Sequence, residues 1–112
     1  MILPLAESAF IEDRKLLNYC LSEEHPIGKH KARIFKSALN ITIENYLYLK
    51  ESIEMAVLTN DAIFVETTDH GDIYYVDFEL INSPKSSVVR TSWILKHEEN
   101  FPRMTSFYVL IK

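Results

Sequence analysis

The sequence has a single cysteine, Cys20, among its 112 residues. One cysteine cannot form an internal disulfide, and its scarcity fits a reducing compartment. Only two glycines are present, Gly28 and Gly71, so we expect each where the backbone requires one. No apolar run approaches the roughly 20 residues of a membrane-spanning helix. The short apolar start lacks the basic region of a signal peptide. We therefore expect a cytoplasmic protein that does not enter a membrane.

Acidic residues outnumber basic ones by 16 to 12, and the net charge of −4 argues against a general nucleic-acid-binding field. The charges are unevenly distributed along the chain. Residues 25–43 contain four bases and no acid, whereas residues 44–79 contain nine acids and one base. Residues 80–112 are again basic. If the fold brings the two basic segments together, they can form an anion site despite the negative total.

A hydrophobic content of 47% and a charged content of 25% are ordinary for a globular protein. The length predicts one domain covering residues 1–112. A chain of this size buries roughly two-thirds of its unfolded surface, which suffices for a core without disulfides or metal.

Apolar residues recur with helical spacing in the first half of the chain. The expected helices are Glu12–Leu21, with Cys20 on its apolar face, a second from Pro26 or Gly28 to Leu39, and a third over Thr42–Leu58. Asn40 and Thr42 are both candidates to cap the third helix.

After Asp61 the apolar period changes to two, which is typical of half-buried antiparallel strands. The expected strands are Ala62–Thr68, Ile73–Ile81, Ser87–Lys96 and Arg103–Ile111, with a tight turn at Asp69–Asp72 and with Thr105, Phe107, Val109 and Ile111 on one face of the last strand. This order predicts an α+β fold, with N-terminal helices packed on one face of a four-stranded antiparallel meander sheet.

Lys31 is the most unusual residue by position, because it lies on the apolar stripe of the second helix. A buried lysine is costly unless it is paired, and burial favours catalytic use. The alternative is a lysine at the edge of the stripe that extends its ammonium into water. His30, its neighbour, is a candidate general acid or base.

The start of the second helix is a candidate anion site, because free N–H groups and the helix dipole attract negative charge. Gly28 would let a phosphate approach the backbone, and Lys29 would add charge. The commoner alternative is a solvated basic turn, and the spacing matches no phosphate loop or dinucleotide motif. His25, before Pro26, is better suited to a turn or cap than to catalysis.

The last two strands offer hydroxyl groups, guanidinium groups and a stacking surface. Candidates are Arg103 and Thr105 opposite the helix, and Ser92 and Trp93 as substrate contacts, with Arg90 and Ser106 nearby. A lone tryptophan is more often a core residue, which we favour for Trp93. The four histidines lack metal-site spacing, so we expect no metal and no cofactor.

Three groups of residues resemble a family of small uncharacterised bacterial domains that is abundant in cyanobacteria. They are His25-Pro26-x-Gly28-x-His30-Lys31-Ala32-x-x-Phe35, then Ser92-Trp93-Ile94, then Pro102-Arg103-x-Thr105. The resemblance covers Lys15 to the C-terminus. It implies a short stand-alone protein with a small antitoxin-like protein partner.

Helices followed by a four-stranded antiparallel sheet are also similar to the barnase–EndoU–colicin–RelE group of ribonucleases. That similarity implies a metal-independent ribonuclease-like domain acting on RNA. His30 would be the acid or base, Lys31 and Arg103 would hold phosphate, and Thr105 would face them. The alternative is a non-catalytic protein- or anion-binding module, with acidic residues 44–79 as its partner-facing surface. A third hypothesis is a homo-oligomer that pairs through the edge strand at Arg103–Ile111.

Overall fold

The computed structural model describes residues 1–110, except for the side chains of Tyr19 and Cys20. Two expectations lie outside the described residues: the side chain of Cys20 on a helix's apolar face, and Ile111 at the end of the last strand.

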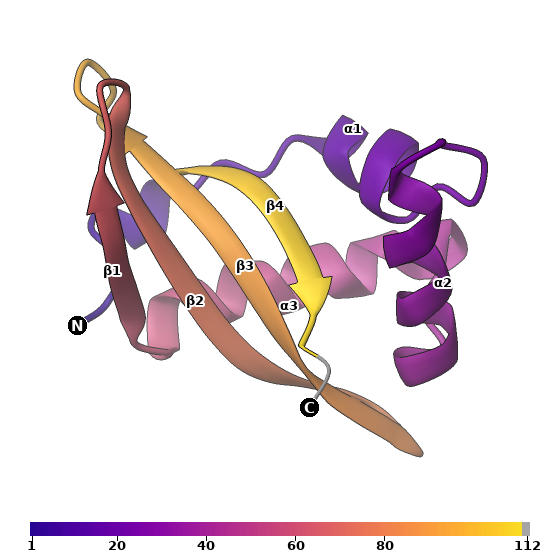
Figure 1. The fold of residues 1–112 in the computed structure, drawn as a ribbon. Coiled ribbons are helices and arrows are strands. Elements are labelled where there is room, and N and C mark those ends of the chain that lie inside the picture. The colour runs from indigo at the N-terminus through magenta and orange to yellow at the C-terminus, as the bar shows by residue number, and fades with distance from the viewer. Residues whose placement is uncertain (111–112) are drawn as a thin grey trace.

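A layer of helices packs against a four-stranded antiparallel sheet of order β1-β2-β3-β4 (Figure 1). The elements are η1 (Ala6–Ser8), α1 (Asp13–Lys15), η2 (Leu16–Cys20), α2 (Gly28–Leu39), η3 (Ile43–Asn45), α3 (Tyr46–Thr59), β1 (Ala62–Thr67), β2 (Gly71–Asn82), β3 (Lys85–Lys96) and β4 (Arg103–Val109). The predicted α+β class and meander topology are confirmed. None of the helices among residues 1–110 is long and apolar enough to cross a membrane.

The first predicted helix differs from a regular α-helix. One α-turn, α1, is followed by η2, a π-helical segment in which Leu21 N–H donates to the Leu16 carbonyl at 3.0 Å. The wider turn places these two leucines, five residues apart, on the same side, and both are fully buried. Lys50 of α3 donates to Asp13 at 2.7 Å, which fastens this segment and raises the pKa of the lysine.

The two cap candidates have different roles. Asn40 adopts a left-handed conformation with φ 55° and closes α2. Thr42 caps the following helix: its hydroxyl accepts from Glu44 N–H at 3.2 Å, while the Asn45 side chain accepts from Thr42 N–H at 2.7 Å. This capping box makes Thr42 the N-cap of η3.

Strands β2 and β3 pair over their whole length and contribute residues to the core from one side. The buried residues of this inner side include Tyr74, Val76, Phe78, Leu80, Val89, Thr91 and Trp93. The outer side faces away from the helices, as Figure 1 shows. The alternation expected for these strands is confirmed.

The alternation expected for the last strand is wrong at Thr105. The pairing of β3 with β4 shifts by one residue, with Ser92 opposite Ser106 and Trp93 opposite Met104. Thr105 is therefore the extra residue of a β-bulge and is exposed, while Met104 is buried in its place.

The β1–β2 turn is organised by Thr68 rather than by the aspartates of Asp69–Asp72. The Thr68 hydroxyl accepts from the N–H groups of His70 and Gly71, both at 3.2 Å. Strand β2 begins at Gly71, two residues earlier than expected.

Candidate functional site

The start of α2 is closed by a side chain from the preceding turn. His25 Nδ1 accepts hydrogen bonds from the N–H groups of Ile27 at 3.1 Å and Gly28 at 2.9 Å. The His25 carbonyl accepts from Lys29 N–H at 3.0 Å. These amides were the predicted anion cradle, and they are already satisfied within the chain. The free N–H groups expected at Gly28 and Lys29 are therefore bonded within the chain, because the histidine caps the helix. Anion binding by Gly28 and Lys29 stays a prediction.

Lys31 is half-buried and links α2 to the edge strand β4. Its Nζ donates to Ser106 Oγ at 2.7 Å and lies 5.5 Å from the centre of the Tyr108 ring. Ser106 and Tyr108 belong to the outer side of the sheet, since their neighbours Phe107 and Val109 are buried on the inner side. The lysine therefore passes the edge of β4, beside which α2 lies (Figure 1), and reaches the outer side.

Two further hydroxyl groups lie next to Ser106. Thr105 Oγ1 is 3.0 Å from Ser92 Oγ and also donates to the Ser92 carbonyl at 3.2 Å. Ser92 is the register partner of Ser106 across β3 and β4. We call the group Lys31, Ser92, Thr105, Ser106 and Tyr108 the Lys31 cluster. The bulge at Thr105 aligns its hydroxyl with those of the two serines.

The Lys31 cluster adjoins a tightly held arginine. Arg90, the register partner of Tyr108, donates to both carboxylate oxygens of Asp77 at 2.8 and 2.9 Å. Its guanidinium lies 4.5 Å from the centre of the Tyr75 ring. The bond to Asp77 raises the pKa of Arg90, with a smaller contribution from Tyr108. Because Asp77 neutralises its charge, Arg90 makes the outer side of the sheet more rigid but adds little net positive charge there.

Arg103 is engaged elsewhere. It donates to Glu99 at 2.9 Å, and its guanidinium lies 5.1 Å from the Phe10 ring and 5.3 Å from the Phe101 ring. The hydrogen bond lowers the pKa of Glu99 and raises that of Arg103. These contacts fasten the β3–β4 loop and the N-terminal segment to the beginning of β4. Phosphate binding by Arg103 stays a prediction, and these contacts give it a structural role.

The other predicted site residues are dispersed. Trp93 is fully buried, and its Nε1 donates to Thr91 Oγ1 at 2.8 Å inside the core. It offers no surface for stacking a base, so the expectation that Trp93 contacts a substrate is wrong. The core position that we favoured for it is confirmed. His30 is exposed on α2, about 100° around the helix from Lys31. Its acid–base role stays a prediction.

The structure adds Tyr108 to the site, a residue that the sequence patterns did not single out. Its signal in the sequence was its position two residues after Ser106, on the same side of β4. Among the side chains that the structure describes, which exclude that of Cys20, no three of the His, Cys, Asp or Glu type converge on a metal site.

Fold and site together define a small two-layer α+β domain with a lysine–hydroxyl cluster at the edge of its sheet. The chain belongs to the family described as a domain of unknown function (DUF6883), whose model matches residues 2–111. No curated protein and no solved structure matches it. The resemblance to a family of small domains is therefore confirmed at the level of a domain family that covers nearly the whole chain, whereas the similarity to ribonucleases stays a prediction.

Proposed function

We propose that the chain is a metal-independent ribonuclease-like domain that holds an RNA phosphate at the Lys31 cluster. The observation that carries the proposal is the 2.7 Å hydrogen bond from Lys31 Nζ to Ser106 Oγ, which joins residues 75 positions apart. The Lys31 cluster gathers a cation and four hydroxyl-bearing side chains on a surface that solvent reaches. Cations and hydroxyl donors are the groups that phosphate oxygens bind.

The chemistry is transfer of the phosphate within the RNA strand. The 2′-oxygen forms a bond to phosphorus, the bond to the 5′-oxygen breaks, and a cyclic phosphate and a 5′-hydroxyl result. One group removes the 2′-hydroxyl proton and another protonates the leaving oxygen. Lys31 and the serine hydroxyls stabilise the charge on the phosphorane. His30 is the candidate for one of the two proton transfers.

The first prediction concerns Lys31. The Lys31→Ala variant loses the cation at the phosphate, and we expect at least a roughly 100-fold slower cleavage of RNA. The measurement is the rate of cleavage of a mixed-sequence single-stranded RNA in excess chelator. Ser106→Ala should also slow cleavage, since it removes the hydroxyl that Lys31 contacts.

Lys36→Ala is the matched control, because Lys36 is a cation on the same helix that pairs with Glu23 instead. Circular dichroism melting establishes that each variant folds. A wild-type protein that leaves RNA intact, or a Lys31→Ala variant as active as Lys36→Ala, would overturn the proposal.

A second candidate is a non-catalytic protein- or anion-binding module. The ion pairs of Arg90 with Asp77 and of Arg103 with Glu99 neutralise two cations of residues 80–112, which weakens attraction for RNA and favours a protein partner. This candidate predicts that RNA is neither cut nor bound tightly at physiological salt.

A further inference from the structure

The outer edge of β2 is covered along only part of its length. Strand β1 pairs with β2 from Asp72 to Val76, where Ala62 is the last partner. Beyond Val76, β2 continues to Asn82 beside β3 alone. Within residues 1–110, no backbone hydrogen bond joins the edge of Phe78–Ile81 to a further strand. This second half of β2 is an open strand edge.

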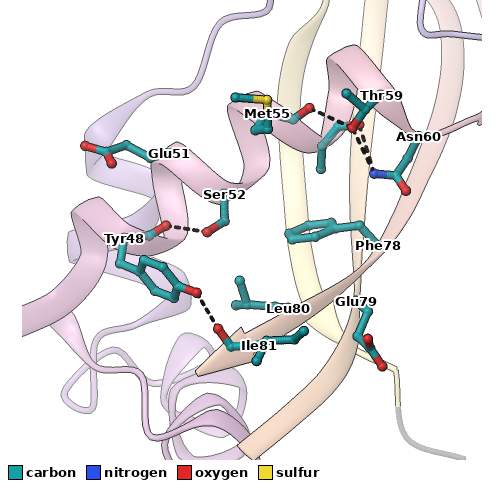
Figure 2. Close-up of a pocket in the computed structure, with 11 residues that line it drawn as sticks. Tyr48, Glu51, Ser52, Met55, Thr59, Asn60, Phe78, Glu79, Leu80 and Ile81 are labelled. Carbon is teal, nitrogen blue, oxygen red and sulfur yellow. Dashed lines mark hydrogen bonds between the residues drawn. The ribbon is translucent and has the colours of Figure 1, made fainter. Parts of the chain in front are cut away.

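The open edge lines a groove of about 580 Å³ between β2 and α3. Figure 2 shows Phe78 and Leu80 between the two elements, with Tyr48, Ser52 and Met55 on the helix. Met55 and Ile81 are large apolar residues with 62% and 53% of their surface exposed. Met55 and Ile81 therefore give the groove an apolar surface that the described residues leave exposed, whereas Phe78 and Leu80 are buried beneath it.

The backbone of β2 points into this groove. The Tyr48 hydroxyl donates to the Ile81 carbonyl, as the dashed line in Figure 2 marks. In an antiparallel pair, alternate residues direct both backbone groups to the same neighbour. Glu79 and Ile81 thus turn theirs away from β3, toward α3. The N–H and C=O of Glu79 and the N–H of Ile81 are positioned for an added strand.

The charge around the groove has one sign. Two of the residues that line it carry a charge, and both are acidic. Glu51 on α3 and Glu79 on β2 are exposed and line the groove. A second copy of the chain would bring Glu79 close to its own equivalent, and like charges paired across strands are destabilising. The charge favours a basic occupant.

We propose that this groove binds an extended, basic segment of another protein, which adds to the sheet as a strand beside Phe78–Ile81. Main-chain hydrogen bonds to Glu79 and Ile81 provide affinity. Apolar side chains of the segment enter the groove against Met55 and Ile81, and its lysine or arginine residues lie against Glu51 and Glu79. The site is separate from the Lys31 cluster and does not depend on ribonuclease activity.

The experiment uses the full chain and a synthetic peptide of about six residues, the usual strand length, that alternates valine and lysine. Its binding is measured by fluorescence anisotropy and mapped by amide chemical shifts. We expect saturable binding, with the amides of Glu79 and Ile81 shifted and protected from hydrogen exchange. The Glu51→Lys/Glu79→Lys variant should bind roughly tenfold or more weakly.

Glu98→Lys is the control, because Glu98 is an exposed acid in the loop between β3 and β4. A peptide N-methylated at alternate amides tests the strand pairing, since it cannot donate the hydrogen bonds; it should not bind. The proposal is overturned if the two charge variants bind equally, if the methylated peptide binds as well, or if the shifts map to another surface. Self-association of the protein through this edge would also overturn it, because the occupant would then be a second copy.

Discussion

Gly71 shows how one residue can be fixed by the approach of a neighbouring strand. It opens β2 opposite Lys96 of β3. A Cβ at this position would overlap the Leu95 carbonyl oxygen and lie 2.7 Å from the Lys96 Cα. Both obstacles are backbone atoms, so a side-chain rotation cannot relieve them. The scarcity of glycine suggested that Gly71 meets a requirement of the backbone. That requirement is the close approach of β3, which leaves no room for a side chain.

Gly71→Ala should therefore destabilise the protein by about 1–3 kcal/mol, since the two strands must separate locally. Urea unfolding monitored by tryptophan fluorescence measures the change. Ser86→Ala, at an exposed position of β3, is the control and should change stability by less than about 0.5 kcal/mol. An unchanged midpoint for Gly71→Ala would contradict this account.

For His25 and Lys31, the residue type and its place in the sequence suggested a role. Neither indicated which residue would be the partner. A histidine before proline predicted a turn or cap, and His25 does cap α2. Lysine on an apolar stripe predicted either pairing in the interior or extension into water. Its partner is Ser106, which lies 75 residues away and could not be identified by local pattern.

The ion pair of Glu99 and Arg103 holds the loop between β3 and β4 against the beginning of β4. The pair holds the pKa of Glu99 below its ordinary value. Such a carboxylate contributes stability that is fully present above its unfolded-state pKa and is lost as the pH falls through the lower folded-state value. The contribution therefore declines below about pH 5.

We accordingly expect Glu99→Gln to be less stable than wild type at neutral pH, with the difference shrinking as the pH falls. Urea unfolding at a series of pH values down to about pH 3 measures it. Glu98→Gln, in the same loop and exposed, should show no such convergence. A difference for Glu99→Gln that is independent of pH would exclude the ion pair as its source.

Strand β4 illustrates what an element's own sequence leaves open. Alternation placed Thr105 on the inner side, but the bulge transfers that position to Met104. A bulge arises from the pairing of two strands, so the sequence of β4 alone does not specify it. Its N-terminal edge is covered in addition by Phe10, which bonds to Pro102 and Met104. Pairing of two copies through β4 stays a prediction.

At the scale of the whole molecule, the helical layer is joined to the sheet through aromatic packing. Phe35 of α2 and Phe107 of β4 are fully buried, with ring centres 5.2 Å apart in an edge-to-face arrangement. The core around these two rings contains residues from both the helices and the sheet. The position of α2, and with it that of Lys31, depends on this contact.

Phe35→Ala should cost about 3–5 kcal/mol, because it leaves a cavity between the two layers. Thermal and urea unfolding measure the loss. Ile27→Ala is the control at the start of the same helix, where the side chain is 63% exposed, and it should have little effect. Equal effects of the two substitutions would mean that α2 is not anchored at Phe35.

Much of the fold followed from periodicity, because the spacing of apolar residues reflects which side of an element is buried. The fold class, the four strands and the boundaries of α2 were predictable for this reason. The π-helical turn was not, since it depends on how Leu16 and Leu21 both reach one core.

The candidate site was predictable in part. Lys31, Ser92 and Thr105 were identified by residue type and do come together, whereas Trp93 is buried and Arg103 binds Glu99. The sequence by itself determined the alternation of helix and strand patterns and the separation of acidic and basic segments. Only the tertiary structure decided which polar groups meet and where β2 is left open, because strand register and helix docking are set by long-range packing.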